Sequence, residues 1–115
     1  MTASQTVSLA LKLNLSVCID LSHTFMASQY FELDFYSELE QMLEVSDYLH
    51  VSDASSVDDE GLQIGQGKID FDVVLSLLRK KPDAKLRAIV EVWQGHLFEG
   101  KGFKSAIQKL GECNW

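Results

Sequence analysis

The chain has 115 residues, of which 46% are apolar, and its formal net charge is -7. This composition indicates one globular unit and excludes a disordered tail, and the acidic charge argues against nucleic acid as a partner because phosphate groups would be repelled. No apolar stretch reaches the ~18 residues that cross a bilayer. Cys18 and Cys113 lie too far apart in the sequence for a metal knuckle or a redox motif. We therefore expect a soluble, cytoplasmic protein with free thiols.

Three short apolar runs, at residues 15–19, 48–51 and 86–92, predict buried parallel strands. Between and after them, apolar residues recur at helical spacing within 35–43, 71–78 and 103–110, and a weaker helical pattern at 7–13 precedes the first strand. The helix ends that we expect are Ser4 or Thr6 as the first N-cap, Asp70 as the N-cap of the helix at 71–78, Pro82 as the stop of that helix, and Gly111 as the last C-cap.

The alternation of strands and helices predicts an α/β fold with right-handed crossovers and a parallel sheet. Strand ends near residues 20, 50 and 91 are spaced roughly as in a (β/α)₈ barrel, in which about 250 residues form eight units. The second interval is longer because of a polar loop at 52–68. Three strands do not close a barrel. The chain is therefore a fragment of a longer protein, or it finds a partner that completes the sheet, or it is a small open α/β layer.

A residue of metal-ligand type ends each predicted strand: Asp20, His50 and Glu91. Parallel strands present their C-terminal ends at one edge of the sheet, so these three side chains are expected to converge there. A single Asp in this position is more often a turn or helix cap, but three such residues in succession favour a site. Two carboxylates and one imidazole suit one divalent ion of Mn, Mg, Co, Fe or Zn. The sequence therefore predicts a metal site with these three ligands.

Other polar residues beside the strand ends have two interpretations each. His23 follows Asp20 by three residues and either contacts substrate, metal or the Asp20 carboxylate, or caps the loop. Asp53 either accepts a hydrogen bond from His50 and so orients it, or starts a turn. Asp59 either reaches the site from the long loop or is a solvated loop acid, and solvation is the favoured interpretation.

Further candidates for contact with a substrate follow the second and third strands. Gln63, Gln94 and His96 are suited to polar groups, whereas Trp93 either stacks on a sugar ring or packs against the next helix. The two glycines within 65–67 do not make a dinucleotide-binding fingerprint, because the third glycine and the preceding strand are missing. We interpret this segment as a turn that brings the chain close to the edge of the sheet.

Four motifs together resemble the late part of the xylose-isomerase-like superfamily, which includes sugar-phosphate isomerases, ketose 3-epimerases, inosose dehydratases and the endonuclease IV class. They are Asp20-x-x-His23, His50-x-x-Asp53, the Gly-x-Gly-x-Ile-Asp-Phe order within 64–71, and Glu91 at a strand end. The resemblance covers nearly the whole chain from residue 15 onward. It implies a partial (β/α)₈ TIM barrel: residues 1–115 would be its C-terminal portion, a single unit with about three parallel strands and flanking helices.

A closer likeness is to the C-terminal isomerase-like barrel that is fused to some sialic or legionaminic acid synthases. The amino-acid sequence is similar at residues 50–54, 59–65 and 91–96. The resemblance implies one divalent metal ion with Asp20, His50 and Glu91 at its ligand positions and His23 at a position that contacts substrate or metal. The family's other metal-binding glutamate lies on an earlier strand that has no counterpart here. Nuclease-type members carry a metal-binding histidine where this chain has Gly61, so the one-metal sugar branch is favoured.

Three functions follow from the resemblance. The first is a sugar or sugar-phosphate isomerase or epimerase that works by enediolate proton transfer, with Glu91 and His23 as catalytic residues and with substrate contacts from His23, Gln63, Trp93 and His96. The second is a non-catalytic half-barrel for assembly or regulation within a nonulosonate (sialic-acid-type) synthase. The third and least favoured is an endonuclease IV-like phosphodiesterase. The expected partners are a small sugar or sugar phosphate and either a second copy or the rest of the barrel, with no nucleic acid and no membrane.

Overall fold

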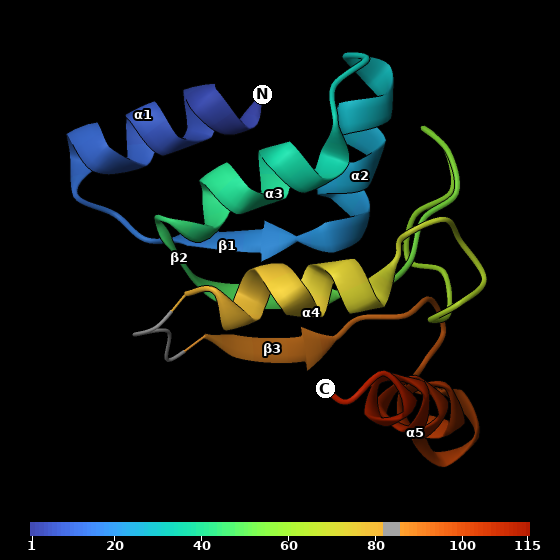
Figure 1. Ribbon diagram of the computed structural model, residues 1–115. Helices are drawn as coiled ribbons and strands as arrows, with labels where there is room; N and C mark the ends of the chain where they lie inside the picture. Colours follow the sequence, from blue (N-terminus) through green and yellow to red (C-terminus); the bar gives the residue numbers. More distant parts are fainter. Residues whose placement is uncertain (82–85) are drawn as a thin grey trace.

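The computed structural model describes residues 1–81 and 86–115, which form a three-stranded parallel sheet with flanking helices (Figure 1). The sheet order is β1-β2-β3. This arrangement confirms the predicted α/β class and is that of a partial TIM barrel. In chain order the elements are α1 (Ala3–Leu13), β1 (Val17–Asp20), α2 (Leu21–Tyr30), α3 (Phe35–Leu43), β2 (Ser46–Val51), α4 (Phe71–Arg79), β3 (Arg87–Val90) and α5 (Leu97–Glu112).

The strands coincide with the three predicted apolar runs to within a few residues. Both neighbouring pairs are parallel, and Leu49 in the central strand is paired with Ile19 on one side and Ala88 on the other. One step further along, Asp20 is paired with His50. The register therefore places the polar end of β1 directly beside the polar end of β2, at the C-terminal edge of the sheet.

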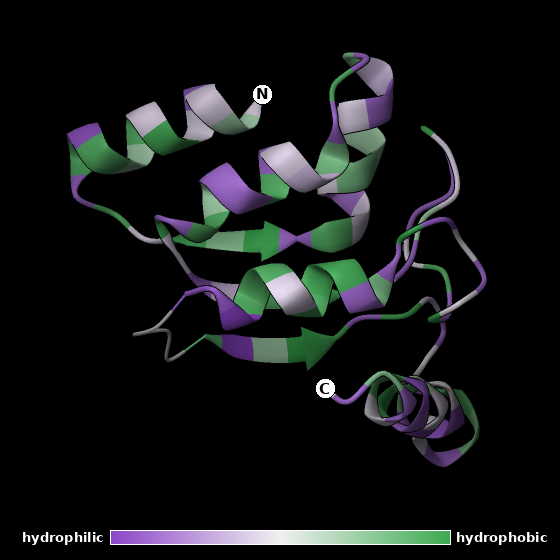
Figure 2. Ribbon diagram, viewed as in Figure 1, coloured by the Kyte–Doolittle hydropathy of each residue, from purple (hydrophilic) through white to green (hydrophobic). Residues whose placement is uncertain are grey.

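One face of the sheet forms the hydrophobic core beneath α3 and α4, which lie side by side across it in Figure 1. Ile19, Leu49 and Val51 from the sheet, Leu39 from α3 and Val74 from α4 are all fully buried, with 0% exposure. Figure 2 shows hydrophobic residues along β1 and mostly hydrophilic ones on the visible surface of α3. Full burial of such a side chain stabilises the fold by ~1.5–3 kcal/mol. The amphipathic pattern of the helices thus fixes which sheet face is covered.

The opposite face of the sheet is largely polar and accessible. Because successive side chains of a strand alternate between faces, this face carries Cys18 and Asp20 from β1, His50 from β2, and Arg87 and Ile89 from β3. Cys18 and Arg87 are exposed, and Ile89 retains 46% of its accessible surface. In a closed barrel such a face lines the interior. The three strands therefore have the geometry of one sector of a barrel.

The N-caps follow the rules of helix initiation, with one shift from expectation. Asp70 caps α4 as predicted, and its carboxylate accepts hydrogen bonds from two backbone N–H groups of the first turn. The cap of α1 is Thr2, which forms a reciprocal capping box with Gln5. The predicted caps Ser4 and Thr6 are wrong because the helix begins earlier than its weak apolar pattern.

The C-terminal helix differs from expectation at both ends. Phe98–Gly100 have positive φ angles and kink the start of α5, so that its regular part follows Gly100 and includes the predicted helix at 103–110. Gly111 lies inside the helix and the C-cap is Cys113, so the predicted glycine cap is wrong. Pro82, the expected stop of α4, lies outside the described residues. Across 1–81 and 86–115, α5 is the longest helix, and none combines the length and apolar character that a bilayer crossing requires.

Helix α2, directly after β1, has no counterpart among the predicted elements. Its buried residues are Leu21, Ser22, Phe25 and Ser28. Two of these four are serines, and Ser28 satisfies its buried hydroxyl by donating to the carbonyl of Phe25 (2.6 Å). The buried face therefore lacks the apolar periodicity from which a helix is predicted.

Candidate metal centre

Asp20, His50 and Glu91 come together at the C-terminal edge of the sheet. Asp20 ends β1 beside His50 of β2, and the N–H of Glu91, the residue after β3, donates to the carbonyl of Val51 (2.9 Å). His50 Nδ1 lies 2.7 Å from Glu91 Oε2 and 4.0 Å from Asp20 Oδ2. One donor atom from each of the three residues lies within 4.8 Å of the others. The three residues that the sequence predicts as ligands therefore lie close together in the structure.

The geometry and chemistry of this donor set fit a divalent ion. Oxygen and nitrogen donors lie about 2.0–2.6 Å from such ions, so two donors of one ion are separated by at most ~5 Å. The side chains are 21% exposed for Asp20, 32% for His50 and 56% for Glu91, so an ion can reach them from solvent. Two carboxylate oxygens and one imidazole nitrogen select Mn, Mg, Co, Fe or Zn over copper.

Asp20 acts as a helix cap and still presents an oxygen to the site. Its Oδ1 accepts hydrogen bonds from the backbone N–H of His23 (3.0 Å) and from the hydroxyl of Ser22 (2.9 Å). The bond from His23 makes Asp20 the N-cap of α2. Its Oδ2 lies 3.0 Å from Nδ1 of His23 and 4.0 Å from Nδ1 of His50. Capping and metal binding were alternative interpretations of this carboxylate, but its two oxygens allow both. The cap also restricts the rotation of the carboxylate and so fixes the direction of Oδ2.

His23 lies between two carboxylates. Its Nδ1 is 3.0 Å from Asp20 Oδ2, and its Nε2 is 2.5 Å from Glu60 Oε2. Partial burial alone lowers the pKa of His23, but the hydrogen bonds and charges of Glu60 and Asp20 outweigh it and raise the pKa above 6.5. Glu60 belongs to the loop between β2 and α4 and was not predicted as a site residue. Its one sequence signal is the acidic run at 58–60.

Asp53 does not orient His50, so that interpretation is wrong. Its side chain is completely buried, and its two oxygens accept four backbone hydrogen bonds of 2.8–3.1 Å from within its own loop. The donors are the N–H groups of Ala54, Gly65, Gly67 and Ile69. A side chain at position 67 would collide with this carboxylate, which explains the glycine there. Asp53 is therefore the residue around which the loop folds, and the loop in turn positions Glu60.

The loop is also joined to the chain that follows β3. Asp53 and Leu62 form an antiparallel bridge with two hydrogen bonds of 2.9 Å. The N–H of Trp93 donates to the carbonyl of Gly61 (2.7 Å), and Gly61 adopts a positive φ of 66°. These bonds hold the loop beside the C-terminal edge of β3, next to Glu91.

A cleft of about 650 Å³ opens beside the three ligands. Asp20 and Glu91 lie in its wall, together with His23, Trp93 and His96. Trp93 is 77% exposed, so most of its ring surface is accessible from solvent. The cleft therefore combines the donor set with an accessible aromatic surface and with further polar groups.

Gln63, which was expected to contact a substrate, is directed away from the cleft, and Asp59 does not reach the cleft either. Gln63 donates from Nε2 to the carbonyl of Gly102 (3.0 Å) and accepts at Oε1 from the N–H of Ile64 (3.0 Å). Its amide ties the loop to α5 and does not line the cleft. Asp59 accepts hydrogen bonds from two nearby serine hydroxyls (2.6 and 3.2 Å) and is exposed, as the solvated interpretation expects.

Comparison with known proteins places this architecture in a family. The sequence model described as xylose isomerase-like TIM barrel matches residues 2–113. The chain belongs to this family. Membership confirms the superfamily resemblance and fits the sugar isomerase and epimerase class, whose sites lie at the C-terminal ends of barrel strands. No curated protein and no solved structure matches the chain significantly.

Proposed function

We propose that this xylose isomerase-like chain is a divalent-metal-dependent sugar isomerase or epimerase domain. The observation that carries the proposal is the approach of donor atoms from Asp20, His50 and Glu91 to within 4.8 Å of one another, beside a cleft whose wall includes Asp20 and Glu91. Catalytic residues of TIM-barrel enzymes lie at this edge of the sheet. The donor set is also the one that a hard or borderline divalent ion prefers.

The chain's own residues supply the proton transfer. A divalent ion held by Asp20, His50 and Glu91 would polarise the sugar carbonyl and stabilise the enediolate that forms when the neighbouring carbon loses its proton. A carboxylate has two oxygens, so Glu91 can serve as a ligand and as the base that removes and returns this proton. His23, held in place by Asp20, donates a hydrogen bond to a substrate oxygen when its Nε2 leaves Glu60.

The remaining cleft residues orient the sugar. Trp93 offers an exposed ring face on which the C–H side of a sugar can stack, and its position is fixed by the backbone hydrogen bond to Gly61 (2.7 Å). His96 offers a polar ring at the same opening. Gln63 has no part in this arrangement because its amide is engaged by the loop and α5.

The accessible face of the sheet supports a second candidate function. Arg87 and Ile89 are exposed on the face that lines a barrel interior, and a three-residue donor set leaves room for a further ligand from another strand. This favours a chain that works together with the remaining strands of a barrel or with a second copy. A non-catalytic half-barrel within a nonulosonate synthase, for assembly or regulation, is the alternative that this face supports.

Metal binding tests the proposal directly. Asn at position 20 keeps an oxygen for the helix cap but removes the charge, so Asp20→Asn separates the ligand role from the cap role. We expect this variant to lose Mn²⁺ affinity by at least ~100-fold, beyond the 10–100-fold typical of residues that only support a ligand. Isothermal titration with Mn²⁺ measures the affinity, and circular dichroism confirms the fold.

Asp34→Asn is the matched control. Asp34 caps α3 as Asp20 caps α2, with its carboxylate accepting from the N–H of Ser37 (2.8 Å), but it lies outside the donor set. This substitution should leave Mn²⁺ affinity unchanged. Equal Mn²⁺ affinities in the Asp20 and Asp34 variants, or no Mn²⁺ binding by the wild type, would refute a metal site at this edge.

A further inference from the structure

We propose that the cleft takes a neutral, unphosphorylated polyhydroxy carbonyl compound and excludes sugar phosphates. This inference rests on the proposed function and concerns the substrate class of the same site. It follows from three features of the described residues: the charges that line the cleft, the places of the basic side chains, and the state of the backbone N–H groups near the cleft.

The wall of the cleft is acidic. Asp20, Glu60 and Glu91 line it, and within the described part of the chain no lysine or arginine does. A divalent ion neutralises two of these three carboxylates, and His23 lies between Asp20 and Glu60 with contacts to both. A phosphate group carries up to two negative charges and needs cationic or N–H partners when it leaves water. Uncharged hydroxyl groups, in contrast, find acceptors in these carboxylates.

None of the nine basic residues in the described part of the chain lines the cleft, and five of them lie at the opposite edge of the sheet. Since α1 and α4 both lead into strands, their C-terminal ends lie at the edge of the sheet opposite the cleft, as does the first residue of β3. This opposite edge carries Lys12, Arg79, Lys80, Lys81 and Arg87. The other four, Lys68, Lys101, Lys104 and Lys109, belong to the loop before α4 and to α5, and they do not line the cleft either.

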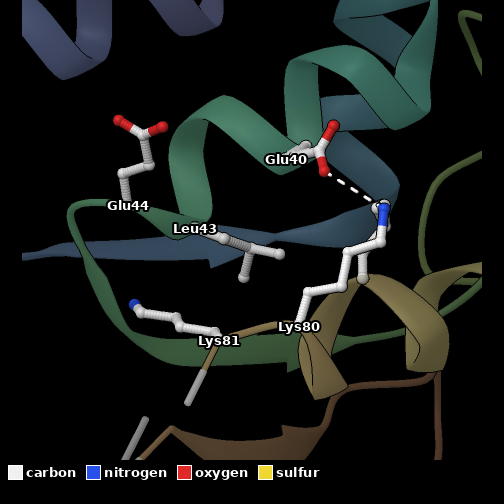
Figure 3. A pocket seen from close by; sticks show the side chains of 6 residues that line it. Glu40, Leu43, Glu44, Lys80 and Lys81 are labelled. Carbon is white, nitrogen blue, oxygen red and sulfur yellow. Dashed lines mark hydrogen bonds and ion pairs between the residues drawn. The ribbon is translucent and has the colours of Figure 1, made fainter. Parts of the chain in front are cut away.

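Two lysines of the opposite edge are also already paired. Figure 3 shows Lys80 reaching from the end of α4 to Glu40 of α3, a contact of 3.3 Å. Lys81 donates to the backbone carbonyl of Ser46 (2.5 Å). These lysines stabilise the packing of α3 and α4 and are directed away from the site.

Backbone N–H groups at helix starts are the other common phosphate ligands, and several of those near the cleft are already engaged. The Asp20 carboxylate occupies the N-terminus of α2 by accepting from the N–H of His23 (3.0 Å). At the start of α5, the N–H groups of Gly95, Leu97 and Gly100 donate to carbonyls of the same segment at 3.0–3.2 Å. A phosphate at either position would have to displace bonds that the fold already makes.

Binding of matched sugars tests the inference. Equilibrium dialysis of the Mn²⁺-loaded protein with radiolabelled D-fructose and D-fructose 6-phosphate compares a neutral probe with its phosphorylated form. We expect the neutral sugar to bind at least tenfold more tightly at low ionic strength, and the ratio to fall as salt screens the repulsion.

Charge reversal at the cleft supplies the second measurement. Glu60→Lys should reduce the preference for the neutral sugar at least tenfold, because it replaces a carboxylate of the cleft wall by a cation. Glu44→Lys makes the same change of charge at the opposite edge, in the groove drawn in Figure 3, and should leave the preference unchanged. Equal effects of the two substitutions would overturn the argument, because the effect would then come from net charge alone.

The outcomes separate this inference from the proposed function. Mn²⁺ binding that depends on Asp20, together with equal or tighter binding of the phosphorylated sugar, overturns the substrate class and leaves the metal site standing. Mn²⁺ binding without measurable binding of either sugar also overturns it. A wild type that binds no Mn²⁺ overturns both.

Discussion

The buried carboxylate of Asp53 permits a sharp test of how the loop beside the site is held. In Asp53→Asn the new side chain has one acceptor oxygen and one NH₂ group. In either orientation of the amide, the NH₂ group faces two backbone N–H donors that the carboxylate now satisfies, either Gly65 and Gly67 or Ala54 and Ile69. Two hydrogen bonds to a charged group are lost, each contributing ~1.5–3 kcal/mol.

The expected loss for Asp53→Asn is therefore at least ~3 kcal/mol, a large part of the ~5–15 kcal/mol that stabilises a domain. Urea denaturation at neutral pH measures it, and for a chain of this size the melting temperature should fall by more than ~10 °C. Asp59→Asn is the control, since Asp59 is exposed and should change stability by less than ~0.5 kcal/mol. Equal denaturation midpoints for the two variants would refute the role assigned to Asp53.

Two further predictions concern local backbone and charge. Gly67→Ala should destabilise the fold by ~1–3 kcal/mol because the new Cβ would meet the Asp53 carboxylate. Gly65→Ala should cost only the ~1–2 kcal/mol of a residue in the left-handed conformation, since nothing lies within 4 Å of its Cβ position. Denaturation midpoints of the two variants check which substitution costs more. Hydrogen bonds from the Ser37 hydroxyl and N–H lower the pKa of Asp34 below 3.8. The stability that this carboxylate adds is therefore present above about pH 4 and is lost as the pH falls through its folded-state pKa, so the difference between wild type and Asp34→Asn should vanish in acid denaturation series near pH 2.

Local sequence patterns predicted the strands and the polar residues at their ends because both depend on short stretches of chain. Apolar runs make buried strands, and parallel pairing then aligns their ends, so that Asp20 and His50 had to be neighbours once the sheet formed. Helix α2 was not predicted because its own stretch of chain lacks an apolar pattern. Its buried face includes Ser22 and Ser28, which carry no apolar signal.

The loop residues could not be predicted because their roles depend on contacts between distant segments. Spacing suggested that Asp53 serves His50, but β2 ends at Val51 and the chain then turns, so that the carboxylate lies inside the loop. The contact of Glu60 with His23 joins residues 37 apart in the sequence. It exists because the Asp53 hydrogen bonds fold the loop back toward the edge of the sheet, and no local pattern encodes that.

The two aspartates near the strand ends have different roles in the site. Asp20 caps α2 with one oxygen, and its other oxygen lies near both His23 and His50, so the start of a helix fixes the direction of a ligand. Asp53 uses both oxygens on its own loop and contributes nothing to the donor set, yet the loop that it holds supplies Glu60. A substitution at Asp20 should therefore mainly change metal affinity. A substitution at Asp53 should mainly change the stability of the fold, and the loss of loop structure should in turn weaken the contact of Glu60 with His23. Similar residues near strand ends thus have different roles, and the hydrogen-bond partners of each carboxylate oxygen distinguish these roles.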